Sequence, residues 1–153
     1  MVLRFEKVSR LFGAFAAVQS LDLELHRGEV LTLLGPSGCG KTTTLRMAIG
    51  LERADAGRIS YGAVTVDNPQ SGVFIAPEQR QMGIVFQSYA IWPHMNVFEN
   101  VAFPLRTRKT GEREIHEKVK AFLDIVGLAG FENRSGMHLS GGQQQRVAVA
   151  RGL

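Results

Sequence analysis

The chain has 153 residues, 44% of them hydrophobic, and its 18 Lys and Arg residues against 14 Asp and Glu residues give a net charge of +4. This composition excludes a disordered or collagen-like chain and predicts one soluble globular domain. The lone Cys39 excludes an intrachain disulfide, and the sequence shows neither a structural zinc pattern, a signal pattern nor a long apolar run, so we expect a cytosolic chain.

The first third of the chain predicts two strands and a helix. Leucines at alternate positions of Leu21–Leu25 predict a strand with one dry face, followed by a turn at Arg27-Gly28. Val30–Leu34 is almost continuously apolar, which predicts a strand buried on both faces. Lys41–Leu51 predicts a helix that stops near Gly50. The local order is therefore strand, glycine-rich loop, helix.

The middle of the chain predicts more strands. Ile59–Tyr61 and Val64–Val66 have the pattern of a short hairpin that turns at Gly62. Met82–Phe86 is apolar and predicts another buried strand.

The last third predicts helices. Asn96 and Glu99 match a capping box, which predicts a short helix that Pro104 ends. A second helix, stopped by Gly127, is indicated by an apolar stripe at helical spacing. The stripe consists of Ile115, Val119, Phe122, Leu123 and Val126. Gln143–Leu153 predicts a final helix.

One glycine-rich segment has the pattern of a phosphate-binding loop. Gly35-Pro-Ser-Gly-Cys-Gly-Lys41-Thr42 fits G-x-x-x-x-G-K-[ST] between a predicted strand and a predicted helix. Its glycines let backbone N–H groups converge on a polyphosphate at the start of a helix, where Lys41 neutralises the β and γ oxygens and Thr42 holds Mg²⁺. The pattern therefore predicts bound ATP and Mg²⁺. The binding residues are Gly35, Pro36, Ser37, Gly38, Cys39, Gly40, Lys41, Thr42 and Thr43.

A second helix start also suits a phosphate. In Leu139-Ser-Gly-Gly-Gln143, Ser140 can cap a helix while Gly141 and Gly142 let a phosphate approach the backbone. One ATP does not need two such sites on one chain. We therefore expect a two-fold dimer in which the first loop of one copy faces the second motif of the other.

Together these motifs resemble the nucleotide-binding subunit of ATP-binding cassette (ABC) transporters across all 153 residues. The phosphate loop, the Gln87 that ends Gly83-Ile-Val-Phe-Gln, and the Leu139–Gln143 signature stand in family order. The resemblance implies that Phe12 stacks on adenine and that Gln87 reaches Mg²⁺ and the attacking water. It implies catalytic roles for Lys41, Gln87 and Ser140, metal binding by Thr42 and Gln87, and contacts from Ser140, Gly141, Gly142 and Gln143 to nucleotide.

The implied fold is an α/β P-loop NTPase with a mostly parallel central sheet, an N-terminal antiparallel portion and a helical subdomain. We expect residues 1–153 to be a partial nucleotide-binding domain. About 1–87 and 137–153 belong to its ATP-binding core, and about 88–136 form the helical subdomain.

The apolar, aromatic segment Tyr89–Phe98 lacks a single helical period. It suits a docking surface for a transmembrane permease subunit, and equally the core of the helical subdomain. The run Val-Phe-Gln-Ser-Tyr-Ala-Ile-Trp-Pro-His-Met resembles bacterial importers of ferric ion, polyamines, sugars or oxyanions. The resemblance implies a subunit that hydrolyses ATP to drive import, located at the inner face of the membrane through its permease.

The family's catalytic Asp-Glu pair is missing from the sequence. Relatives carry it after the signature helix, followed by a switch histidine, whereas this sequence has no Asp-Glu dipeptide and its four histidines precede Arg151-Gly-Leu153. We expect a truncated chain that binds nucleotide and is deficient in hydrolysis on its own.

Two other functions remain open. The pI near 9.6 also suits a soluble ABC ATPase that acts on nucleic acid or ribosomes. The basic residues are scattered, however, so we expect no nucleic-acid partner. A truncated chain that binds nucleotide without hydrolysing it, and so acts as a regulator, is the other alternative.

Overall fold

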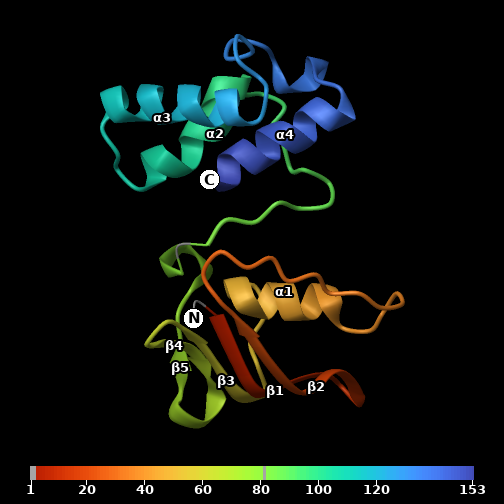
Figure 1. Ribbon diagram of the computed structural model, residues 1–153. Coiled ribbons are helices and arrows are strands. Elements are labelled where there is room, and N and C mark those ends of the chain that lie inside the picture. Colours follow the sequence, from red (N-terminus) through yellow and green to blue (C-terminus); the bar gives the residue numbers. More distant parts are fainter. Residues whose placement is uncertain (1–2, 81) are drawn as a thin grey trace. The chain divides into compact units, whose positions relative to one another are not determined.

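A computed structural model describes residues 3–80 and 82–153. The chain divides into two compact units, Met1–Met82 and Gly83–Leu153. The first unit contains the strands and one α-helix, and the second contains three α-helices (Figure 1).

The first unit is built on a five-stranded sheet in the order β2-β1-β3-β4-β5. Every neighbouring pair of these strands is antiparallel. The strands are β1 (Leu3–Phe12), β2 (Phe15–Leu25), β3 (Ala56–Tyr61), β4 (Val64–Asn68) and β5 (Val73–Phe74). Two 3₁₀ turns, η1 (Pro69–Ser71) and η2 (Pro77–Gln79), flank β5.

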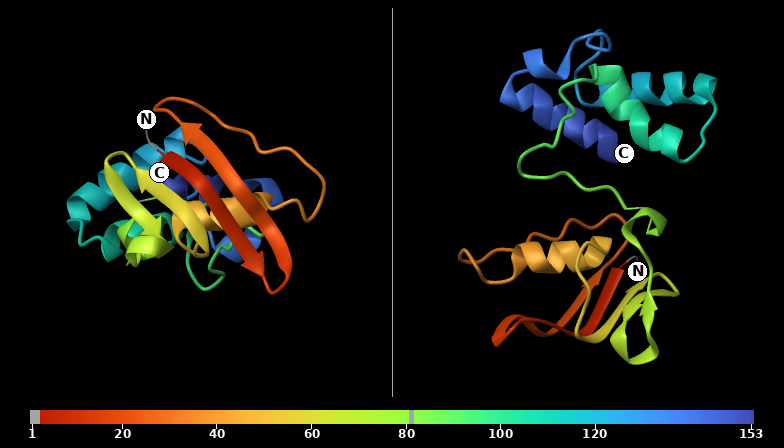
Figure 2. Two further views of the ribbon diagram at one scale, coloured as in Figure 1. Left: turned by 90° about the horizontal axis from the view of Figure 1, so that it is seen from below. Right: turned by 180° about the vertical axis from the view of Figure 1, so that it is seen from behind.

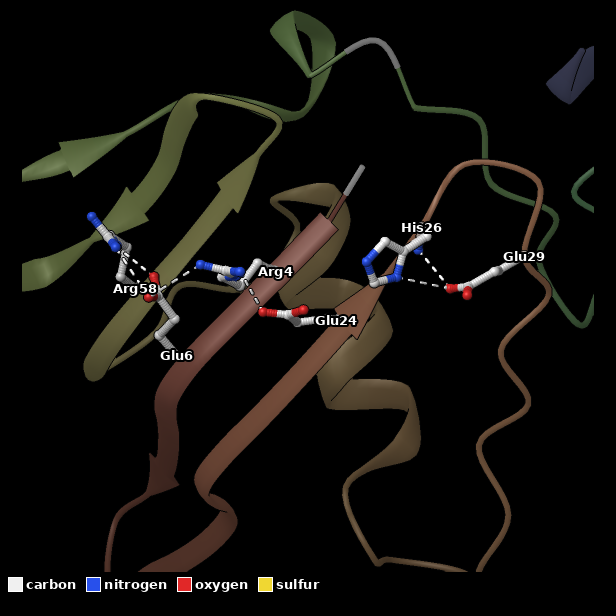
Figure 3. Close-up of polar contacts among 6 residues, drawn as sticks. All are labelled: Arg4, Glu6, Glu24, His26, Glu29 and Arg58. Carbon is white, nitrogen blue, oxygen red and sulfur yellow. Dashed lines mark hydrogen bonds and ion pairs between the residues drawn. The ribbon is translucent and has the colours of Figure 1, made fainter. Parts of the chain in front are cut away.

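Helix α1 (Lys41–Ile49) covers one face of this sheet (Figures 1 and 2). Met47 and Ala48 of the helix are buried with Phe5 and Ile59 of the strands in one apolar cluster. Since side chains alternate along a strand, the residues between the buried ones point to the opposite face. There Glu6 binds Arg58, in a row of charged residues across β3, β1 and β2 (Figure 3).

Three of the local predictions for this unit are confirmed. The predicted strand Leu21–Leu25 forms the end of β2, and α1 ends at Gly50, whose φ of 82° is left-handed. The predicted hairpin corresponds to β3 and β4, with Gly62 at a φ of 59° between them. Each signal lies within a few residues of the turn or cap that it specifies.

The predicted buried strands Val30–Leu34 and Met82–Phe86 are wrong, because neither segment is a strand in the structure. Val30 is 93% exposed and Leu34 is 87% exposed. A strand exists only through hydrogen bonds to a neighbouring strand, and in the described part of the chain neither segment pairs with one. The predicted parallel portion of the sheet therefore has no counterpart among the described strands.

The second unit packs three helices around one apolar core. They are α2 (Val97–Thr107), α3 (Glu112–Ile125) and α4 (Gly141–Gly152), and a 3₁₀ turn, η3 (Gly136–His138), precedes α4. The core contains residues from all three helices: Val97, Val101, Leu105, Ile115, Val119, Leu123, Val147 and Ala150. None of the helices in the described residues has the length and apolarity needed to cross a membrane.

The helix ends in this unit follow the sequence signals with one exception. Asn96 and Glu99 form the predicted capping box, with both hydrogen bonds at 2.8 Å. Helix α3 ends before Gly127, whose φ is 67°. Pro104 does not end α2, because the helix continues to Thr107 and tolerates the proline, with its missing N–H donor, inside it.

Candidate functional site

The phosphate-loop residues 35–43 lie together in the first unit, at the start of α1. Gly38 and Gly40 have φ values of 83° and 91°, which L side chains rarely adopt. A Cβ on Gly40 would overlap the carbonyl oxygen of Ala17 in β2. The Gly40 carbonyl accepts hydrogen bonds from the backbone N–H and the hydroxyl of Thr44, at 2.8 and 3.0 Å. Only glycine therefore allows the loop to meet β2 and begin the helix.

The ammonium group of Lys41 lies on this loop. Its Nζ donates to the carbonyl oxygens of Gly35 and Pro36 at 2.7 and 2.6 Å, and lies 3.4 Å from Cys39 Sγ. The first turn of α1 contains no acidic residue. The positive charge of Lys41 and the partial positive charge of the helix start are therefore available together to an anion.

The neighbouring threonines differ in accessibility. Thr42 is exposed, Thr43 is half-buried and Thr44 is buried. An exposed hydroxyl oxygen is a suitable ligand for Mg²⁺, which prefers hard oxygen donors and keeps several waters. The position of Thr42 therefore fits the predicted metal role.

Phe12, the predicted adenine-stacking residue, is at the end of β1 with 46% of its surface exposed. The Arg10 guanidinium lies 4.7 Å from its ring centroid. Arg10 is itself fixed by Glu52 and Asp55, at 2.6 and 2.8 Å. The ring is thus supported by a cation and is partly open to solvent.

Sequence reasoning missed Arg80, which supports the far end of α1. Arg80 is 4% exposed and donates to the carbonyl oxygens of Met47 and Ala48 at 2.7 and 2.9 Å. Desolvation lowers the pKa of Arg80 and raises that of the nearby buried Asp67. The only available signal is general: the last carbonyls of a buried helix need donors.

In the second unit, the signature residues form a capped helix start. The Ser140 Oγ accepts from the Gln143 backbone N–H at 3.3 Å, and the Gln143 side chain accepts from the Ser140 N–H at 2.9 Å. An added Cβ on Gly141 or Gly142 would meet nothing within 4 Å. With no acidic residue in the first turn of α4, this is a second helix start that an anion can approach.

Gln87 is exposed in the second unit and is followed by a strained turn. Tyr89 and Ala90 have φ values of 58° and 47°, a left-handed conformation that costs about 1–2 kcal/mol for each non-glycine residue. The side-chain amide oxygen of the exposed Gln87 is a suitable ligand for Mg²⁺.

The segment Tyr89–Phe98 is partly core and partly surface. Val97 is buried, and Ile91 and Phe98 pack against the core of the unit, whereas Pro93 and His94 are exposed. The core interpretation therefore holds for Ile91, Val97 and Phe98, whereas the docking surface stays a prediction for the exposed residues.

Asn100, which sequence reasoning also missed, fixes this segment from α2. Asn100 is fully buried, accepts from the Trp92 N–H at 3.0 Å and donates to the carbonyl oxygens of Trp92 and Asn96 at 3.2 and 2.9 Å. Trp92 also packs against Phe103, with ring centroids 4.7 Å apart.

The structure thus places most of the predicted site residues in two groups, to which neither Phe12 nor Gln87 belongs. Residues 35–43 surround the start of α1 in the first unit, and Ser140, Gly141, Gly142 and Gln143 surround the start of α4 in the second. The described residues contain no group of three or more His, Cys, Asp or Glu side chains that could hold a metal ion.

A family model described as ABC transporter matches residues 18–153. The trehalose/maltose import ATP-binding protein MalK of Thermococcus litoralis is 47% identical over 98% of this chain and 40% of its own length. The Fe(3+) ions import ATP-binding protein FbpC of Rhizobium etli is 49% identical over 97% of this chain and 40% of its own. The chain therefore spans about two fifths of the length of these relatives.

The fold of the chain is also similar to that of solved ABC transporter cassettes. The dimeric structure of MJ0796, a bacterial ABC transporter cassette, is 28% identical, with a TM-score of 0.83 over 99% of this chain and 68% of that one. A post-hydrolysis state of that cassette, bound to ADP and Pi, gives a TM-score of 0.79 at 29% identity over the same shares of the two chains. These similarities confirm the predicted fold class, although the parallel strands are not formed here.

Proposed function

The chain belongs to the ABC transporter family, and from this premise we propose that it forms the part of an importer's ATP-binding subunit that holds the phosphates of ATP. The observation that carries this proposal is the start of α1. There two left-handed glycines, the lysine ammonium and a helix start without acidic residues occur within one loop.

In this proposal the loop residues hold the β- and γ-phosphates of ATP. The backbone N–H groups around Gly38 and Gly40 point at the phosphate oxygens, and Lys41 exchanges its loop carbonyls for phosphate. Phe12 supports the adenine ring by stacking. The other contacts come from the loop residues named above.

Thr42 and Gln87 are the proposed ligands of Mg²⁺, through a hydroxyl and an amide oxygen. Bound Mg²⁺ supplies charge neutralisation on the β- and γ-phosphates. Gln87 also contacts the attacking water in this proposal.

The signature residues are proposed to act on a second copy of the chain. Ser140 and the Gly141 and Gly142 N–H groups contact the γ-phosphate of the nucleotide held by the partner copy. The dimer described for the MJ0796 cassette supports this arrangement.

A permease subunit is the proposed membrane partner, and it would hold the chain at the cytoplasmic face of the membrane. The import names of MalK and FbpC support this partner over a ribosome or nucleic acid. The exposed part of Tyr89–Phe98, at Pro93 and His94, is the proposed contact.

We also infer that residues 1–153 alone hydrolyse ATP slowly. Their sequence contains no Asp-Glu dipeptide to supply the general base, whose absence costs roughly 10²–10⁴-fold in rate. A phosphate-release assay that gave several turnovers per minute, abolished by Lys41→Ala, would contradict this inference.

Calorimetric titration with MgATP tests the binding proposal. Lys41→Ala should weaken binding by about 1.5–3 kcal/mol, or roughly 10- to 100-fold, because a charge-assisted contact is lost. Lys120→Ala, which removes an exposed lysine from α3, is the matched control and should bind normally. Equal affinity in the Lys41 variant and the parent would refute the proposal.

A further inference from the structure

The last turn of α4 is tied to the turn after Gln87 by one side chain. Arg151 donates to the carbonyl oxygens of Ala90 and Tyr89 at 2.7 and 3.0 Å. Its guanidinium carbon also lies 4.5 Å from the Trp92 ring centroid. One arginine therefore contacts three of the four residues in Tyr89–Trp92.

The backbone of this turn requires support. Tyr89 and Ala90 are consecutive non-glycine residues in the left-handed region, and the Ala90 N–H donates to the Ser88 carbonyl at 2.7 Å. Such conformations persist only where surrounding contacts hold them, and they collect at segments that switch. Arg151 supplies those contacts from outside the turn.

A second contact joins the same two elements. A Cβ on Gly83 would overlap the carbonyl oxygen of Gly152, so the chain before Gln87 also runs directly against the end of α4. The segment is thus in contact with α4 on both sides of Gln87.

Asn100 and Arg151 fix different parts of the segment. Asn100 binds the backbone of Trp92 and Asn96 from α2, whereas Arg151 binds Tyr89 and Ala90 from α4. Loss of Arg151 should therefore free the Ser88–Ala90 turn and one face of Trp92 while residues 92–96 stay attached.

We propose that Arg151 is a positioning residue that latches the strained turn Ser88–Ala90 and Trp92 to the signature helix. Helix α4 begins with the signature residues and ends with this latch, and a helix of twelve residues spans about 18 Å as a stiff rod. A movement at Ser140 is therefore passed to Tyr89–Phe98. This inference rests on the proposed function, since it links the nucleotide contact to the permease contact.

Trp92 is the only tryptophan in the chain and reports directly on the latch. Arg151→Lys keeps the charge but loses the planar fork and its stacking on the ring. Acrylamide quenching of Trp92 should rise about twofold in this variant because the turn opens locally. Arg146→Lys is the matched control. Arg146 also lies on α4 and donates to the main-chain carbonyls of Val126 and Gly127, but not to the turn.

The response to nucleotide separates a positioning role from simple support of the fold. MgATP should change Trp92 quenching in the parent and in Arg146→Lys, and the change should be lost in Arg151→Lys although calorimetry gives the same MgATP affinity. Unchanged quenching in Arg151→Lys, or a retained response to MgATP, would overturn the latch. A parent chain that fails to bind MgATP would instead overturn the proposed function, and the comparison without nucleotide would still decide the latch.

Discussion

The guanidinium of Arg80 caps the C-terminal end of α1 by donating to the carbonyl oxygen of Met47 at 2.7 Å. Further donations to Ala48, Ile75 and Val66 complete its hydrogen bonds within a buried site. The phosphate loop lies at the start of α1, and Arg80, the residue that follows η2, holds the other end of this helix. Support of the loop depends on this contact as well as on the loop's own sequence.

Replacement of Arg80 should therefore destabilise the first unit. Arg80→Met leaves these carbonyls with fewer donors and should lower the free energy of unfolding by about 2–4 kcal/mol. Arg53→Met is the matched control, because both guanidinium groups lie over the Phe74 ring, that of Arg80 at 5.3 Å and that of Arg53 at 4.3 Å, but Arg53 is exposed. Urea denaturation measures both variants, and equal losses would show that the capping bonds contribute nothing specific.

Gly40 and Gly38 provide a matched pair for the loop. Both are left-handed, but only at Gly40 would a Cβ overlap the backbone of β2. Gly38→Ala should cost about 1 kcal/mol from backbone strain alone, and Gly40→Ala roughly 2–4 kcal/mol because β2 must also move. Thermal unfolding measures the stability difference. If both variants unfold at the same temperature, contact with β2 does not shape the loop.

The features that could be predicted from the sequence are those whose cause is local. The capping box of α2 joins residues three positions apart, and the stops at Gly50, Gly62 and Gly127 each depend on one left-handed residue. The phosphate loop and the signature are also continuous segments. The order of residues within each segment is therefore enough to predict phosphate binding.

The features that could not be predicted depend on partners distant in the chain. Arg80 reaches Met47 across 33 positions and Arg151 reaches Tyr89 across 62, and neither arginine differs in local sequence from an exposed one. The apolar run Val30–Leu34 shows that a local pattern can also predict an element that does not form. Apolarity indicates a buried strand, but a strand also needs a paired neighbour.

Asn100 should be essential for the order of the segment before α2. Asn100→Ala leaves the half-buried carbonyls of Trp92 and Asn96 with fewer donors and should lower the free energy of unfolding by about 2–3 kcal/mol. Trp92 emission should shift to longer wavelength as its backbone loosens. Asn133→Ala, at an exposed position, should change neither property. Unaltered Trp92 emission in Asn100→Ala would mean that other contacts fix the segment.

The row of charges on the open face of the sheet predicts a pH dependence (Figure 3). Arg58 donates to both carboxylate oxygens of Glu6, at 2.6 and 3.0 Å, and holds the pKa of Glu6 below its ordinary 4.5. The folded chain therefore binds fewer protons here than the unfolded chain, so the stability from this pair is present above pH 4.5 and is lost as the pH falls through the lowered pKa. Glu6→Gln should lose less stability than the parent as the pH falls from about 5 through the lowered pKa of Glu6, whereas Glu78→Gln, an exposed control, should follow the parent. Urea denaturation at each pH gives the two curves, and parallel curves for Glu6→Gln and the parent would contradict the assignment.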